Sequence, residues 1–205
     1  MKISDLTFNY YNRKNNKSVY LILHGSGLNG INDSFIKNIF LSLQDDISRS
    51  VFMFNFLYCE RGKKGSSGKE LIEEKETLET VIDFLEKEGY EEIIIVAKSL
   101  GGIIASSYFK RDKHPKIKFK IIVLGLVLGD FITENLKGKL GLVIQGENDR
   151  FGNGEKVKEE LQKNGVNASV VEIKNADHSY RDSNGNPVFQ KNAIEEIKKW
   201  LYYNR

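Results

Sequence analysis

A serine stands where a strand-like run of residues gives way to a helix-like one. The apolar run 93–97 ends two residues before Ser99, and a helical pattern covers residues 100–111. A strand that turns directly into a helix has room only for small residues two positions before and two positions after the turn, and Ala97 and Gly101 hold these positions. The turn would expose the Ser99 hydroxyl at the positive end of the helix dipole, where a weak nucleophile can attack a carbonyl carbon.

Only three histidines are present, so few side chains can serve as the base for such a serine. A serine nucleophile needs an imidazole within hydrogen-bond reach and a carboxylate that orients the ring. We assign these roles to His178 and Asp149, each of which follows a predicted strand, and the chain order Ser99, Asp149, His178 is the order used on this kind of sheet. His24 is expected to pack beneath the loop that follows it, and His114 to lie on the surface.

Three other side chains offer alternatives. Glu147 lies two residues before Asp149 and could replace it as the acid, whereas Asp177 is adjacent to His178 and is badly placed to orient that ring. Lys98 could replace the imidazole as base only if burial lowered its pKa by several units.

The order of the elements is that of an α/β protein. Strands are predicted at 19–23, 51–56, 93–97, 119–124, 140–145 and 168–173. Helices are predicted between them: one capped at residue 32 or 33, one over 69–88 with Leu71 and Ile72 on its apolar stripe, one over 100–111, one ending at Gly165, and a closing helix with Pro187 in its first turn. Right-handed connections then predict a mostly parallel sheet with helices on both faces, in a single domain over residues 1–205. Ligands of such sheets bind beyond the carboxyl ends of the strands.

The composition excludes several classes of function. The 31 basic and 28 acidic residues among 205 leave a net charge of only +3, which does not favour nucleic acid as a partner. No apolar run is long enough to span a membrane, and the amino terminus lacks the apolar stretch of a signal peptide. The only cysteine is Cys59, which allows no intrachain disulfide, so we expect a reduced, cytoplasmic protein. Candidate metal ligands are few, and we expect neither a metal nor a cofactor.

Four segments together resemble those of the α/β-hydrolase superfamily. They are residues 24–27 (His-Gly-Ser-Gly), 97–102 around the serine, 145–152 around the aspartate and 177–180 around the histidine. The resemblance covers nearly the whole chain and is closest to the small, lid-poor dienelactone-hydrolase-like enzymes, in the branch of the testis-expressed protein thirty. Dienelactone hydrolase itself uses cysteine where this chain has Ser99, so its particular reaction is not implied.

The resemblance implies a serine hydrolase that acts on small acyl esters or thioesters through an acyl-enzyme intermediate. Ser99 would attack, His178 would move the proton, and Asp149 would stay ionised. The backbone amides of Ser26 and Leu100 would form the oxyanion hole. The same triad could instead serve an amidase or an acyltransferase, and the superfamily also includes non-catalytic binding modules.

The expected site is open. Only about fifteen residues separate the strands 119–124 and 140–145, too few for a helical lid. We expect Gly129, Asp130 and Phe131 to line the pocket, with three further aromatics beside them, although each aromatic could equally belong to the core: Tyr58, Phe151 and Tyr180. The expected partner is a small acyl substrate, and the sequence leaves the oligomeric state open.

Residues 62–69 form a glycine-rich and lysine-rich segment between a strand and a helix. The segment has five residues between Gly62 and Gly68, where a phosphate-binding loop has four, and Glu70 replaces the hydroxyl residue that would hold magnesium. We therefore expect a flexible loop near the mouth of the site, and a structural role for Cys59.

Overall fold

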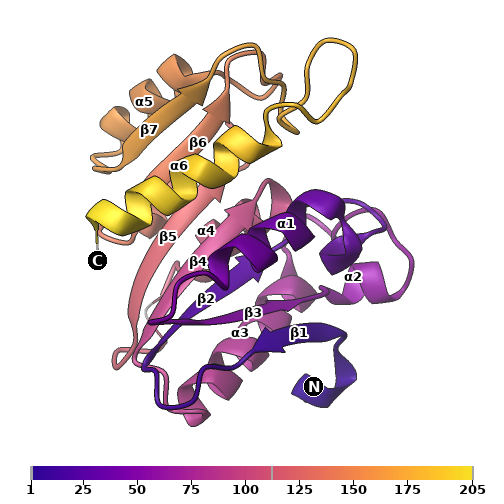
Figure 1. Cartoon of the computed structure of the whole chain (residues 1–205), viewed down its shortest axis with the longest axis vertical. Coiled ribbons are helices and arrows are strands. Elements are labelled where there is room, and N and C mark those ends of the chain that lie inside the picture. Colours follow the sequence, from indigo (N-terminus) through magenta and orange to yellow (C-terminus); the bar gives the residue numbers. More distant parts are fainter. Residues whose placement is uncertain (1, 112, 205) are drawn as a thin grey trace.

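Seven strands form one sheet in the order β1-β3-β2-β4-β5-β6-β7 in this computed structural model (Figure 1). All neighbouring strands are parallel except the edge pair β1 and β3. The strands are β1 (Phe8–Tyr11), β2 (Ser18–Leu23), β3 (Ser50–Phe54), β4 (Glu92–Lys98), β5 (Lys118–Leu124), β6 (Leu140–Gly146) and β7 (Ser169–Ile173). The structure describes residues 2–111 and 113–204, so residues 1, 112 and 205 of the expected domain 1–205 lie outside it. The described residues form a single α/β domain.

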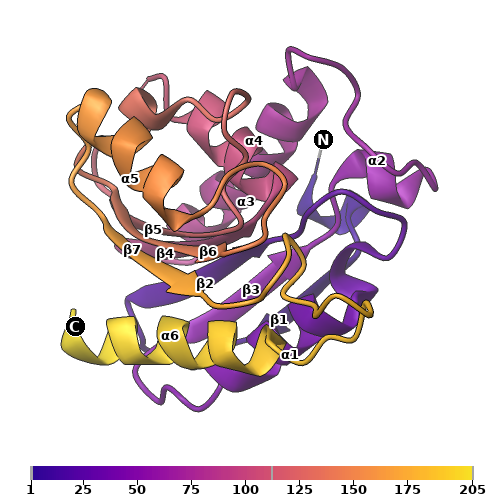
Figure 2. The ribbon, with the colours of Figure 1, turned by 90° about the horizontal axis from the view of Figure 1, so that it is seen from above.

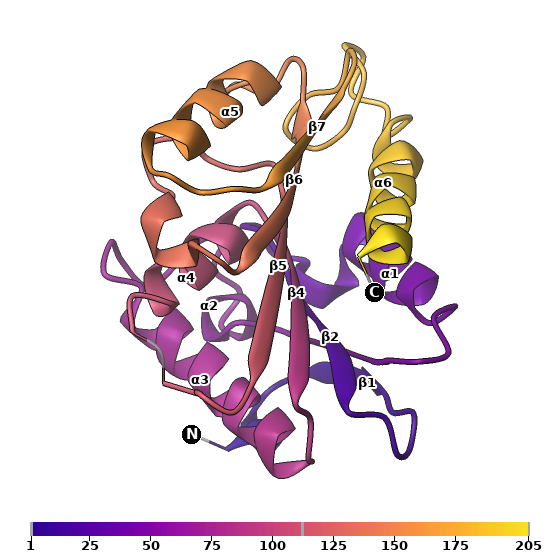
Figure 3. The same cartoon turned by 90° about the vertical axis from the view of Figure 1, so that its left-hand side faces the viewer.

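Helices cover both faces of the sheet. The helices are α1 (Ser34–Leu43), α2 (Leu57–Glu60), α3 (Ile72–Lys87), α4 (Leu100–Tyr108), α5 (Gly154–Lys163) and α6 (Gln190–Tyr203). Seen from above and from the side, α1 and α6 lie together on one face, and α3, α4 and α5 lie on the other (Figures 2 and 3). This is the layered arrangement predicted from the alternation of strands and helices.

Strand β4 illustrates how the sequence builds these two layers. Successive side chains of a strand point to opposite faces of the sheet. In β4, Ile93 and Ile95 therefore pack with the helices α3, α4 and α5, while Ile94 and Val96 pack with α1 and α6. Because both faces are covered, the strand is a continuous apolar run rather than an alternating one.

The predicted strands and helices are confirmed, and the differences lie at their ends and at the edge of the sheet. Strand β1 was not predicted because it pairs only at the sheet edge and its side chains are largely exposed, so it lacks an apolar run. The predicted helix over 69–88 begins only at Ile72, since Leu71 adopts a left-handed conformation (φ 50°). Ile72 was expected on the apolar stripe but is 57% exposed. Pro187 lies three residues before α6 rather than in its first turn.

The connection between β5 and β6 contains no lid. Its only regular element in the described residues is the short 3₁₀ helix η3 (Thr133–Leu136). The expectation that a helical cap is absent is therefore confirmed.

The expectation for His114 was wrong. Its side chain is buried: one ring nitrogen lies 2.9 Å from the Tyr108 hydroxyl and the other 3.0 Å from a carboxylate oxygen of Glu86. A lysine-rich sequence around a histidine does not reveal that residues at the ends of α3 and α4 contact the ring.

Candidate active site

Ser99 occupies a tight turn between β4 and α4. Its backbone is in an unusual conformation for a residue other than glycine (φ 49°, ψ −113°). The helix that follows begins so close to β2 that a Cβ on Gly101 would lie 2.7 Å from the carbonyl oxygen of Leu23. Only glycine fits there, which is the physical reason for the small residue two positions after the serine. Such strained backbone is typical of functional turns.

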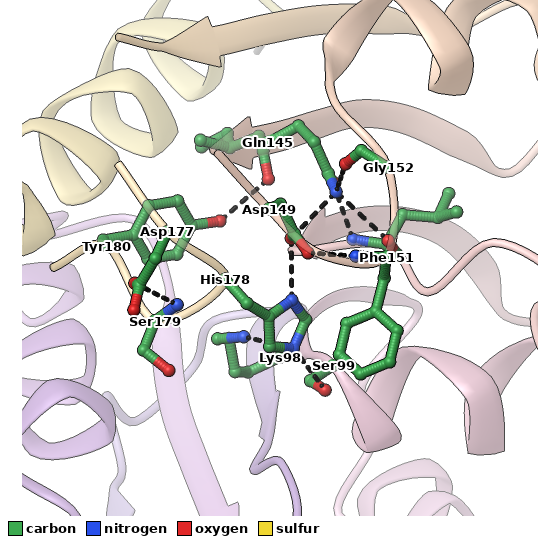
Figure 4. A network of polar contacts seen from close by, with 12 residues as sticks. Lys98, Ser99, Gln145, Asp149, Phe151, Gly152, Asp177, His178, Ser179 and Tyr180 are labelled. Carbon is green, nitrogen blue, oxygen red and sulfur yellow. Dashed lines mark hydrogen bonds and ion pairs between the residues drawn. The ribbon is translucent and has the colours of Figure 1, made fainter. Parts of the chain in front are cut away.

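The structure brings Ser99, His178 and Asp149 into one chain of hydrogen bonds (Figure 4). The Ser99 hydroxyl lies 2.8 Å from Nε2 of His178, and Nδ1 of the same ring lies 2.7 Å from Oδ2 of Asp149. Because a carboxylate only accepts, the ring carries its proton on Nδ1, and Nε2 presents a lone pair to the serine. This is the order of contacts that lets a serine lose its proton as it attacks.

Asp149 is held in place by two further donors. Its side chain is fully buried and accepts hydrogen bonds from the Gln145 amide (2.9 Å) and from the backbone N–H of Phe151 (2.9 Å). The alternative acid, Glu147, is exposed and instead accepts from the backbone N–H of Asn175. The geometry therefore favours Asp149 over Glu147.

Asp177 also turns away from the histidine. One carboxylate oxygen accepts from the backbone N–H groups of Ser179 and Arg181, at 2.7 and 2.8 Å, so it shapes the loop that carries His178. Gly146 allows that loop to approach β6, because a Cβ there would lie 2.4 Å from the carbonyl oxygen of Ala176.

The environment of His178 favours its neutral form. Burial lowers the pKa of His178 below its ordinary value, the Asp149 carboxylate raises it, and the positive charges of Lys98 and Arg150 lower it further. The ring of Phe151 stands edge-on against the imidazole, with 4.7 Å between the ring centroids. A neutral imidazole is the form that can accept a proton from Ser99.

Lys98 also contacts His178, and the sequence did not predict this contact. Its Nζ lies 3.3 Å from Nε2 of His178, and burial lowers the pKa of Lys98 to about 8. The residue had been considered only as an alternative base. Its place directly before Ser99 was the one signal that could have suggested a contact with the histidine.

The loop after β2 brings the expected oxyanion donors beside the serine. A Cβ on Gly25 would lie 3.5 Å from Cβ of Ser99, so the backbone of this loop runs next to the nucleophile. Leu100 is the first residue of α4, where backbone N–H groups have no partner within the helix. Among the described residues, the N–H of Ser26 likewise meets no hydrogen-bond acceptor. Both N–H groups are thus free to bind a ligand.

Three hydrogen bonds fix the backbone of the loop after β2. The Tyr58 hydroxyl donates to the carbonyl of Gly25 (2.8 Å), and the N–H of Gly27 donates to the carbonyl of Lys64 (2.7 Å). His24 is buried, as expected: its Nδ1 donates to the same Gly25 carbonyl and its Nε2 accepts from the backbone N–H of Phe56. With both ring nitrogens occupied, His24 cannot act as the base.

The segment 62–69 and Cys59 also belong to this support. Lys64 brings the segment against the loop after β2, in the expected place near the site. The Cys59 thiol lies 3.3 Å from the carbonyl oxygen of Leu28, which agrees with a structural role.

A small open cavity of about 170 Å³ adjoins the serine. It lies between the loop after β2, the start of α1 and the loop around the histidine, and its polar lining includes Lys98, Ser99, His178 and Arg181. The four aromatic residues expected to line the pocket are not among the residues that line this cavity. Gly129 and Asp130 do not line this cavity, since they lie in the connection between β5 and β6.

Most of the expected pocket aromatics belong to the core. Tyr58, Phe131 and Tyr180 are buried, and the Tyr180 hydroxyl donates to the carbonyl of Ile144. None of these three side chains lines the cavity, because aromatic residues near strand ends can pack inward as well as outward. Phe151 alone among them contacts a residue of the hydrogen-bonded chain, His178.

One cluster in the described residues combines possible metal ligands. Asp83, Glu86 and His114 each have a ligand atom within 4.8 Å of the others. The two ring nitrogens of His114 already contact Glu86 and Tyr108, so the cluster satisfies itself without an ion. It lies near the amino end of β5, away from Ser99.

Comparison with solved structures identifies the fold. A protein of unknown function from Agrobacterium tumefaciens has a TM-score of 0.75 at 15% identity, over 97% of this chain and 91% of that one. A serine hydrolase without a lid from Xanthomonas campestris has a TM-score of 0.70 at 14% identity, over 95% and 89%. Est1E from Butyrivibrio proteoclasticus with ferulic acid bound has a TM-score of 0.70 at 14% identity, over 97% and 95%.

No protein-family model matches the sequence, and no curated protein matches it. None of the helices in the described parts of the chain combines the length and apolar character needed to cross a membrane. The agreement over almost the whole length of several solved structures is thus an agreement of architecture. The chain has the fold of an α/β hydrolase without a large lid.

Proposed function

We propose that the protein is a serine hydrolase that cleaves small acyl esters or thioesters. The observation that carries this proposal is the hydrogen-bonded chain from Ser99 through His178 to Asp149 at the carboxyl end of the sheet. Serine hydrolases and esterases are among the solved proteins of similar fold, although at identities that speak for the fold alone.

The first half of the reaction forms an acyl-enzyme. The Ser99 oxygen attacks the carbonyl carbon of the substrate while its proton passes to Nε2 of His178. The carbonyl oxygen becomes an oxyanion, which the backbone N–H groups of Ser26 and Leu100 stabilise. The tetrahedral intermediate then collapses, the bond to the leaving group breaks, and His178 gives its proton to the departing oxygen or sulfur.

The second half releases the acid. Water replaces the leaving group, loses a proton to Nε2 of His178 and attacks the acyl carbon, after which the proton returns to the Ser99 oxygen. Asp149 remains ionised throughout, keeps the proton on Nδ1 and stabilises the imidazolium that forms transiently. The fully buried carboxylate and its two additional donors suit this fixed role.

The cavity supports small rather than long acyl groups. Its volume is about 170 Å³, and no lid covers it. A polar lining offers little apolar surface for a long acyl group.

We assign the protein to the small dienelactone-hydrolase-like enzymes, in the branch of the testis-expressed protein thirty, on the strength of its four motifs. We also propose a cytoplasmic location, with a small acyl substrate and no nucleic acid or membrane as partner.

Covalent labelling tests the nucleophile directly. A fluorophosphonate probe should label the protein once, at Ser99, and Ser99→Ala should prevent labelling. Labelling of another residue, or none in a folded protein, would reject the mechanism. A panel of p-nitrophenyl esters, thioesters and anilides, at matched acyl lengths, should then give turnover of short-chain esters or thioesters and little of anilides; the reverse order would indicate an amidase.

A further inference from the structure

Two groups approach the same nitrogen of His178. The Ser99 hydroxyl lies 2.8 Å from Nε2, and Nζ of Lys98 lies 3.3 Å from it (Figure 4). The mechanism proposed above uses the first contact and leaves the second without a role. Lys98 ends strand β4, is buried, and directly precedes the serine.

The surroundings of Lys98 do not neutralise its charge. Within the described residues no carboxylate lies at ion-pair distance from Nζ; the nearest acidic influences come from Asp149, Asp177 and Asp33. The His178 ring and the face of Tyr180, whose centroid lies 5.8 Å from Nζ, also adjoin the ammonium. Two further cations are near: Arg181 lines the same cavity as Lys98, and the charge of Arg150 acts on His178. A buried ammonium without a paired carboxylate is costly, so its retention beside the imidazole calls for a physical reason.

The backbone is shaped to allow this contact. A Cβ on Gly125 would lie 3.0 Å from Nζ of Lys98 and 2.9 Å from Cε1 of His178. Gly125 also has φ 67°, a conformation that favours glycine. The end of β5 therefore leaves room for the two side chains to meet at one place.

An ammonium at this place affects the two protonated forms of His178 differently. In the resting site, a proton taken from solvent onto Nε2 would create a second positive charge facing Nζ, which is unfavourable. During the reaction, the same proton arrives from Ser99 together with a negative oxyanion, so the net charge of the site does not increase. The ammonium thus disfavours protonation of His178 by solvent more strongly than it disfavours transfer of the Ser99 proton to His178 during the reaction.

We propose that Lys98 is a positioning residue whose ammonium keeps the imidazole of His178 neutral and ready to accept the proton of Ser99. The kinetic part of this inference rests on the proposed function, whereas the effect on the histidine itself does not. With a pKa of about 8, Lys98 stays mostly charged at and below pH 6.5, the ordinary pKa of a histidine.

The test measures the titration of His178 in the free protein by NMR of its ring C–H, assigned with His178→Ala. Lys98→Met removes the charge at similar length, and Lys98→Gln removes it while keeping an N–H donor. Lys120→Met is the matched control: it removes a lysine from the neighbouring strand β5, where Lys120 pairs with Glu92 (3.6 Å). Both Lys98 variants should raise the pKa of His178 by about one pH unit or more, and the control should leave it unchanged.

The same proteins supply a kinetic readout. The acidic limb of kcat/KM should move to higher pH in both Lys98 variants, by the amount that the NMR titration gives. An unchanged pKa of His178 in either Lys98 variant, or an equal rise in Lys120→Met, would overturn the inference. If the pKa rises as expected while no variant or parent hydrolyses any ester, the proposed function fails and the role of Lys98 in setting the histidine's charge stands.

Discussion

Two buried cations lie at opposite ends of the sheet, and their surroundings differ. Arg49 directly precedes β3 at the amino end, Lys98 ends β4 at the carboxyl end, and each residue is 8% exposed. The Arg49 guanidinium lies 2.9 Å from Asp46 and 3.4 Å from Glu92. Lys98 faces a histidine instead.

The pKa values of the two groups move in opposite directions. Burial lowers the pKa of both, but at Arg49 the interactions with Tyr20 and with the carboxylates of Asp46 and Glu92 outweigh it, and the pKa is raised. At Lys98 burial prevails and the pKa falls to about 8. The buried charge at the amino end of the sheet, far from the serine, is therefore paired with carboxylates. The buried charge of Lys98, beside the hydrogen-bonded serine, has no carboxylate at ion-pair distance among the described residues.

The largest effects are expected at the carboxyl end of the sheet. Ser99→Ala should abolish nearly all ester hydrolysis while the thermal unfolding curve stays close to that of the parent, because the change deletes only a hydroxyl. His178→Ala should lower kcat by a factor on the order of a thousand or more. Steady-state kinetics on a p-nitrophenyl ester checks both variants, and parent-like turnover in either would refute the nucleophilic mechanism.

The acid should matter somewhat less than the serine. Asp149→Asn keeps the size of the side chain but removes the negative charge that fixes the tautomer of His178, so kcat should fall by several orders of magnitude, but by less than in Ser99→Ala. Glu147→Gln is the matched control on the same loop and should have little effect. A larger loss in the control than in Asp149→Asn would show that the wrong acid has been assigned.

Stability should separate the two cations. Arg49→Met removes the guanidinium that bridges Asp46 and Glu92, although Lys120 still lies 3.6 Å from Glu92, and should lower the free energy of unfolding by about 2 kcal/mol, with kcat unchanged. Lys98→Met removes an uncompensated buried charge and should raise the free energy of unfolding by about 1 kcal/mol at pH 7. Urea titrations followed by fluorescence measure both, and a comparable loss in the two variants would erase the distinction between the two ends.

The pH dependence of stability sharpens this contrast. The pKa of Lys98 is about 8 in the folded protein and 10.5 ordinarily, so between these values the unfolded chain binds more protons than the folded one. The stability of the parent should therefore rise with pH in that window, relative to Lys98→Met. The advantage of the methionine variant should shrink from pH 8 to 10.5; a constant advantage would indicate packing rather than charge.

The acidic limb of activity is a smaller effect. The sequence alone suggested an ionisation of about 6 to 7.5, the range of an ordinary histidine beside a carboxylate. Because burial lowers the pKa of His178, outweighing Asp149, kcat/KM should instead rise along an ionisation below 6.5. A profile that rises only near pH 8, the pKa of buried Lys98, with an active His178→Ala, would point to Lys98 as the base.

The smallest expected effect is that of chelation. Dialysis against EDTA should leave kcat/KM unchanged, since the proposed reaction requires no metal. Loss of activity that added zinc restores would contradict this proposal and direct attention to Asp83, Glu86 and His114, the acidic and histidine cluster of the described residues.

Local patterns predicted most of the fold because its strands are buried on both faces. A parallel strand such as β4 must be apolar throughout, which makes it visible as a run of residues, and α3 shows a clear apolar stripe. Strand β1 escaped prediction because an edge strand with exposed side chains has no such requirement. The start of α3 at Ile72 was not predicted, because the left-handed conformation of Leu71 ends the helix without changing the apolar pattern of the sequence.

The sequence by itself determined the order of the elements and the three residues of the hydrogen-bonded chain, since each stands directly after a strand or in a turn with its own local signature. Only the tertiary structure decided which long-range neighbours these residues have. It placed Lys98 against His178 over Gly125, buried His114, and directed Tyr58 and Tyr180 into the core. The reason is physical: a backbone turn is set by adjacent residues, whereas the charge and burial of a side chain depend on segments that meet only when the sheet is complete.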